Sequence, residues 1–65
     1  MNTTIYEQKT TGGKSRYLVS YNDAVTFIDY LEWSNTQAGV SRKITVERYK
    51  GRKYNPYTFI WVCVQ

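Results

Sequence analysis

The sequence predicts a two-layer α+β domain of order β-β-α-β-β, in which one helix covers one face of a four-stranded, mainly antiparallel sheet. Three observations predict this class. A Gly-Gly pair separates two short strand-like segments, apolar residues recur at helical spacing after residue 22, and the chain ends in a nearly continuous apolar run. The 65 residues allow one domain, spanning 1–65.

The first two elements are predicted to form a β-hairpin. Thr3 to Lys9 and Arg16 to Tyr21 contain the Thr, Ile, Val and Tyr residues that are typical of strands. Thr10 to Lys14 lies between them and includes Gly12 and Gly13. Because glycine tolerates positive φ angles, this pair favours a tight hairpin turn.

A helix is predicted from about residue 23 to about residue 34. Four apolar residues at positions i, i+3, i+4 and i+7 share one helical face. They are Ala24, Phe27, Ile28 and Leu31. Asn22 is the expected N-cap, and Asp23 places a negative charge at the positive end of the helix. Residues 35–41, with Gly39, are expected to form a loop.

Two further strands complete the predicted sheet. Lys43 to Tyr49 alternates in side-chain character, and Lys50 to Pro56 contains the Gly, Asn and Pro of a loop. Tyr57 to Val64 is the strongest strand signal in the chain, because it is rich in aromatic and β-branched residues.

The last strand is apolar on both faces, although only one helix is available to cover it. One row consists of Thr58, Ile60, Val62 and Val64, and the other of Tyr57, Phe59, Trp61 and Cys63. The aliphatic row is expected under the helix, together with Leu18, Ile44 and Val46. The aromatic row is then expected on the open face, joined by Tyr17, Tyr21 and Tyr49. Two alternatives remain open: the faces are reversed, or a long loop folds over the open face.

Composition excludes several classes of function. The absence of His removes an imidazole base and a His metal ligand, and one Cys cannot form an internal disulfide or a zinc site. We therefore expect no enzymatic activity, no catalytic residue, no metal and no cofactor. Small secreted domains usually carry disulfides, and this chain cannot form one internally, which favours a reducing cytoplasmic location. The first residues lack the features of a signal peptide, and no run is long enough to cross a membrane.

Charge is distributed unevenly along the chain, whose net charge is +4. The predicted helix carries three acidic residues and no basic one, whereas residues 42–53 carry six basic residues against Glu47, a net +5. Basic residues steer a domain toward acidic or phosphate-lined surfaces, and Tyr and Trp anchor interfaces. The candidate partner-binding residues are Arg48, Tyr49, Lys50, Arg52, Lys53, Tyr54, Tyr57, Trp61 and Trp33. The alternative is an ordinary solvated hairpin tip.

In length, element order, the helix after RYLVSYND and the aromatic last strand YTFIWVCV, the chain resembles small phage-encoded host-takeover proteins, including some anti-CRISPR proteins. The resemblance implies a protein without enzymatic activity that binds a host nucleic-acid machine in the bacterial cytoplasm. It rests on architecture, so no functional residue is carried over.

The leading hypothesis is therefore a non-enzymatic inhibitor or adaptor that docks on a host protein or nucleoprotein complex through the basic hairpin and exposed aromatics. One alternative is a module that binds single-stranded nucleic acid on its sheet face. A second alternative is a self-associating regulatory domain, in which the open face pairs with a second copy as a homodimer.

Overall fold

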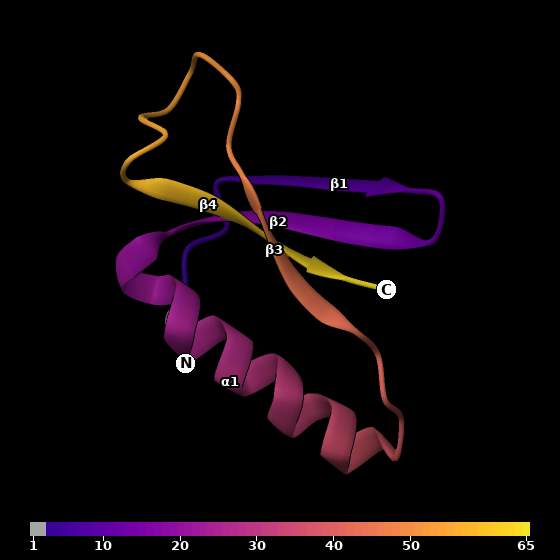
Figure 1. Cartoon of the computed structure of the whole chain (residues 1–65). Coiled ribbons are helices and arrows are strands. Elements are labelled where there is room, and N and C mark those ends of the chain that lie inside the picture. The colour runs from indigo at the N-terminus through magenta and orange to yellow at the C-terminus, as the bar shows by residue number, and fades with distance from the viewer. Residues whose placement is uncertain (1–2) are drawn as a thin grey trace.

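The computed structural model describes residues 3–65 and confirms the predicted α+β class. Within these residues, one helix lies against a four-stranded antiparallel sheet of order β1-β2-β4-β3 (Figure 1). The strands are β1 (Glu7–Thr11), β2 (Lys14–Ser20), β3 (Ile44–Arg48) and β4 (Phe59–Val64), and the helix is α1 (Tyr21–Ala38). The molecule measures 37 × 27 × 14 Å, and it is thin because α1 covers one face of the sheet only.

The β1–β2 hairpin closes with a two-residue turn. Gly12 and Gly13 have φ angles of 61° and 77°, and two consecutive positive φ angles are the signature of a type I′ turn. This turn matches the right-handed twist of the flanking strands. Because both strands continue up to the glycines, the turn is shorter than the predicted segment. β1 also begins later than predicted, at Glu7.

The helix is longer than predicted at both ends. Its N-cap is Ser20, whose Oγ accepts a hydrogen bond from the Asp23 N–H at 3.3 Å. Asn22 lies inside the first turn, so the prediction that it caps the helix was wrong. Gly39, expected within a loop, is the C-cap: it adopts a left-handed conformation, and its N–H donates to the Thr36 carbonyl oxygen.

The core between helix and sheet contains the predicted aliphatic row of β4. Its buried members are Val19, Ala24, Phe27 and Val62, with Ile28, Leu31, Ile44 and Ile60 partly buried around them. The assignment of β2 was wrong by one residue. Tyr17 pairs with Val62 and lies under the helix, whereas Leu18 pairs with Trp61 and lies on the opposite face. Residues directly opposite each other in a ladder share a face. An error of one residue in the prediction therefore exchanges the faces of Tyr17 and Leu18.

A second core lies on the face away from the helix. It contains the buried residues Leu18, Tyr49, Trp61 and Cys63, with Tyr54 and Phe59 packed against them. Residues 49–58, the connection between β3 and β4, supply Tyr49 and Tyr54. The alternative that a long loop folds over the open face is therefore confirmed for this part of the sheet. Trp61 and Cys63 of the aromatic row are buried and Phe59 is partly buried, whereas Tyr57 stays exposed.

Candidate binding surface

The tyrosines of the β3–β4 connection form an aromatic cluster with the last strand. The Tyr49 ring lies 6.2 Å from that of Trp61 and 5.9 Å from that of Tyr54, and the Tyr54 N–H donates to the Tyr49 hydroxyl at 3.3 Å. Tyr49 and Trp61 are only 5% and 7% exposed. The expectation that these two are exposed contact residues is therefore wrong in this structure, because the connection folds back and buries them.

Sequence reasoning missed Tyr6, which completes this cluster from the β1 edge of the sheet. Its ring lies 4.8 Å from that of Phe59 and 5.7 Å from that of Tyr54, both in edge-to-face arrangements. The Tyr6 N–H donates to the Leu18 carbonyl oxygen, which fixes the chain just before β1. Glu7 pairs with Leu18, so strand alternation would put Tyr6 on the helix face, and the sequence pattern gives no signal for this contact.

Tyr57 and Trp33 are exposed, as the sequence predicts. Tyr57 is 90% exposed beside the end of β3, and Trp33 is 57% exposed on α1, where its ring lies 5.9 Å from that of Tyr30. The structure does not bring these two residues together. The helix begins at Tyr21, next to the β3–β4 connection, and Trp33 lies about 18 Å further along its axis, at 1.5 Å per residue.

The four predicted basic residues of this region remain exposed and together. We call Arg48, Lys50, Arg52 and Lys53 the basic segment. None of the four forms an ion pair with a carboxylate in the part of the chain that the structure describes. Lys53 instead holds its ammonium group 5.5 Å from the centre of the Tyr54 ring.

A hollow of about 730 Å³ opens beside the basic segment on the face away from the helix. Its lining includes Glu7, Lys9, Arg16, Glu47, Arg48, Tyr49, Lys50, Gly51 and Trp61. The Lys9 Nζ lies 5.2 Å from the centre of the Trp61 ring, in a cation–π contact. Sequence reasoning did not single out Lys9, which reaches this hollow because β1 pairs beside β2 at Arg16.

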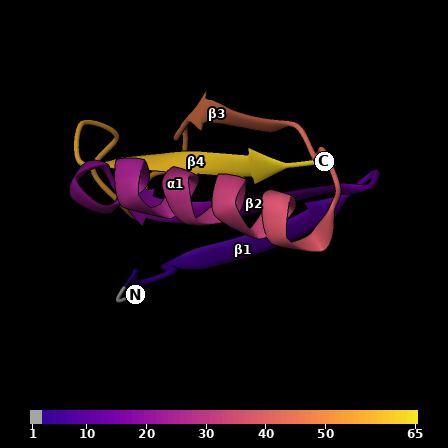
Figure 2. The same cartoon turned by 90° about the horizontal axis from the view of Figure 1, so that it is seen from below.

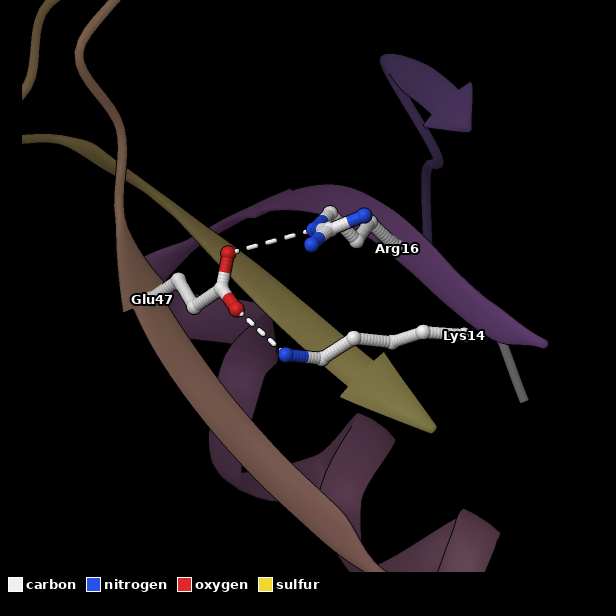
Figure 3. Close-up of polar contacts among 3 residues, drawn as sticks. All are labelled: Lys14, Arg16 and Glu47. Carbon is white, nitrogen blue, oxygen red and sulfur yellow. Dashed lines mark hydrogen bonds and ion pairs between the residues drawn. The ribbon is translucent and has the colours of Figure 1, made fainter. Parts of the chain in front are cut away.

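One wall of the hollow is a three-residue ion-pair network between β2 and β3, shown in Figure 3. The Lys14 Nζ lies 2.6 Å from Glu47 Oε2, and the Arg16 Nε lies 3.1 Å from Glu47 Oε1. Hydrogen bonds from Lys14 and then Arg16 lower the pKa of Glu47 below its ordinary value. The three side chains reach across β4, which lies between β2 and β3.

Cys63 is the residue of β4 that pairs with Arg16 on one side and Thr45 on the other. It is completely buried. Burial, and secondarily the charge of Glu47, raise the pKa of the Cys63 thiol. The thiol therefore stays protonated at neutral pH and packs as a small apolar group rather than acting as a nucleophile.

The Glu47 network predicts a pH dependence of stability. A carboxyl group whose pKa is lower in the folded state stabilises that state above its unfolded pKa, and this contribution is lost as the pH falls through the folded value. We expect the urea midpoint of the wild-type protein to fall more steeply below about pH 5 than that of Glu47→Gln. Parallel curves for the two proteins would show that the network contributes nothing to folding.

Comparisons with protein-family models, curated proteins and solved structures give no match for this chain. In residues 3–65 no helix is both long and apolar enough to span a membrane. Over the same residues, no three His, Cys, Asp or Glu side chains group in a way that could hold a metal ion.

Proposed function

We propose that this chain is a small non-enzymatic binding protein, of the inhibitor or adaptor type, that docks on a host protein or nucleoprotein complex through the basic segment. The observation that carries the proposal is the charge of this segment. Its four cations are exposed and lack carboxylate partners within residues 3–65, and the exposed Tyr57 lies beside Arg48. Unneutralised cations attract an acidic or phosphate-lined surface and raise the rate of association.

The distribution of acidic residues supports the same orientation. Asp23, Asp29 and Glu32 all belong to α1, which lies on the other face of the sheet and carries no Lys or Arg. An acidic partner is therefore repelled from the helix and attracted to the basic segment. The more specific role, phage anti-defence in the cytoplasm of a bacterial host, is supported by the architectural resemblance alone.

Neutralising part of the basic segment tests this proposal. We expect Arg52→Gln with Lys53→Gln to reduce the material captured from a bacterial lysate by the tagged protein, because both cations are exposed. The control is Thr26→Glu with Gln37→Glu, two exposed positions on α1. Each double variant lowers the net charge of +4 by two, so the comparison separates position from total charge.

Capture is measured with and without nuclease, which separates a protein partner from a nucleic-acid partner. Equal capture by the two double variants would mean that the basic segment is not the docking surface. Normal circular dichroism and unfolding curves for both variants are required, so that loss of binding is not loss of folding.

A second candidate function is direct binding of single-stranded nucleic acid in the hollow. Lys9, Arg48 and Lys50 line it without carboxylate partners among the described residues, and phosphates are the natural ligands of such groups. Base stacking has less support, because Trp61 is buried under Lys9. This candidate requires a mobility shift of labelled oligothymidylate at low salt that weakens as salt rises. A homodimer through the open face has less support, since residues 49–58 already cover much of it.

A further inference from the structure

β3 is an edge strand, and within residues 3–65 its outer backbone groups have no hydrogen-bond partner. Among the described strands, its single neighbour is β4. The Gln65 N–H donates to the Lys43 carbonyl oxygen at 3.0 Å, so the backbone groups of Lys43 turn toward β4. Because this direction alternates along an antiparallel strand, Thr45 and Glu47 also turn inward, and Ile44, Val46 and Arg48 present their N–H and carbonyl groups outward.

The helix leaves the side chains of this edge partly uncovered. Val46 pairs with the buried Val62 and so lies on the helix face, yet Val46 is 50% exposed. Figure 2 shows the reason: α1 crosses in front of β4 and β2, while β3 lies beyond it at the outer edge of the sheet. An added strand would extend the sheet beside β3 and cover Val46.

Positive charge surrounds both ends of β3. Arg42 and Lys43 precede the strand, Arg48 is its last residue, and Lys50 follows two residues later. None of these four has a carboxylate partner in residues 3–65. Glu47, the acidic residue of β3, is held by Lys14 and Arg16 across the sheet. The edge therefore combines an apolar centre with basic ends.

The charges at the ends of β3 indicate whether a second copy of the chain or a different partner would pair with its free edge. Antiparallel pairing of two copies of β3 centred on Val46 would place Arg42 opposite Lys50, and like charges in directly opposite positions destabilise a ladder. The other edge strand, β1, has no apolar side chain among its five residues EQKTT. The edge of β3 instead matches an extended segment with an apolar centre and acidic ends.

We propose that β3 accepts an extended peptide of a protein partner as a fifth strand, with apolar residues of the peptide against Val46 and acidic residues beside the cations at the two ends of β3. Main-chain hydrogen bonds supply affinity in this mode of recognition, and side chains supply specificity. The proposal rests on the proposed function, because it gives the chemistry and the binding mode of the protein that the basic segment attracts.

Amide hydrogen exchange of the full ¹⁵N-labelled chain tests the proposal directly. The probe is the acetylated and amidated peptide Glu-Glu-Thr-Val-Thr-Val-Thr-Glu-Glu. We expect it to slow exchange at the outward amides of Ile44, Val46 and Arg48 and to leave the amides of β1 unchanged. The same peptide with Lys in place of every Glu is expected to bind at least about tenfold more weakly, a difference of about 1.4 kcal/mol.

Val46→Pro removes the central outward N–H, and proline is tolerated in an edge strand where the N–H faces solvent. We expect this variant to keep its fold and lose at least about tenfold in affinity for the peptide. Val46→Ala is the comparison variant: it keeps the N–H and shortens only the side chain that contacts the peptide, so it should lose less affinity than Val46→Pro. If Val46→Pro fails to fold, the peptide can be changed instead. N-methylation of both valines removes peptide N–H groups that would donate to β3, and the methylated peptide should not bind.

Absence of protection at Ile44, Val46 and Arg48, or equal binding of the acidic-ended and lysine-ended peptides, would overturn the proposal. Protection of these amides by oligothymidylate and not by the peptide would overturn it in favour of nucleic acid. The two sets of variants distinguish failure of strand addition from failure of the proposed function. Lysate capture that is lost in the Arg52→Gln, Lys53→Gln protein and retained in Val46→Pro keeps the proposed function and rejects strand addition.

Discussion

Replacing Trp61 by alanine is expected to lower the free energy of unfolding by about 3–5 kcal/mol, the usual cost of truncating a buried aromatic residue. Trp61 lies in the middle of the core away from the helix, beside Leu18 and Cys63 and against the Tyr49 ring. At roughly 0.05–0.15 kcal/mol per residue, a chain of this length has a total stability of about 3–10 kcal/mol. The substitution is therefore expected to remove from about a third to all of the stability of the protein.

Trp33→Ala is the matched control, because it removes the same side chain from an exposed position on α1. We expect it to change stability by no more than about 0.5 kcal/mol, as is usual for surface substitutions. Urea unfolding followed by far-UV circular dichroism, a signal that reports mainly the backbone, measures both variants. Equal stability of the two variants would mean that Trp61 is exposed and that residues 49–58 do not cover it.

The element order was predictable because each element has a local signal. Gly12 and Gly13 mark the hairpin turn, and the spacing from Ala24 to Leu31 marks the helix. The capping residue was less predictable, because Ser20 and Asn22 are both good N-caps and the choice between them depends on where β2 ends. Ser20 pairs with Phe59 as the last residue of β2, and this tertiary contact sets the start of the helix at Tyr21.

The face of each β2 residue was not predictable, because Tyr17, Leu18 and Val19 are all apolar and alternation has no polar residue there to fix it. The register with β4 decides it, placing Leu18 opposite Trp61. The burial of Tyr49 and Trp61 was also not predictable, because it too depends on a tertiary contact. Alternation shows which side chains share a face, but it does not show whether a distant segment folds over that face.

The connection between β3 and β4 passes close to the Tyr49 ring at Gly51. Gly51→Ala is expected to destabilise the protein by about 1–3 kcal/mol, as overpacking of a filled site does. A Cβ built on Gly51 would overlap the ring and hydroxyl of Tyr49. The ring cannot move aside cheaply, because it packs between Trp61 and Tyr54 and its hydroxyl accepts the Tyr54 N–H. Glycine is therefore required at position 51 because the backbone there lies too close to Tyr49 to leave room for a side chain.

Lys50→Ala is the control for Gly51→Ala, since Lys50 is the exposed neighbour and its truncation meets no packed group. Urea midpoints of the two variants should differ clearly, and equal midpoints would show that the segment can move away from Tyr49. The consequence extends to binding. Lys50 and Arg52 flank Gly51, so a backbone shift that relieves the overlap also displaces two of the four cations of the basic segment. Gly51→Ala should then weaken partner capture even under conditions in which the protein remains folded, whereas loss of Lys50 alone should remove one charge and leave the other three in position.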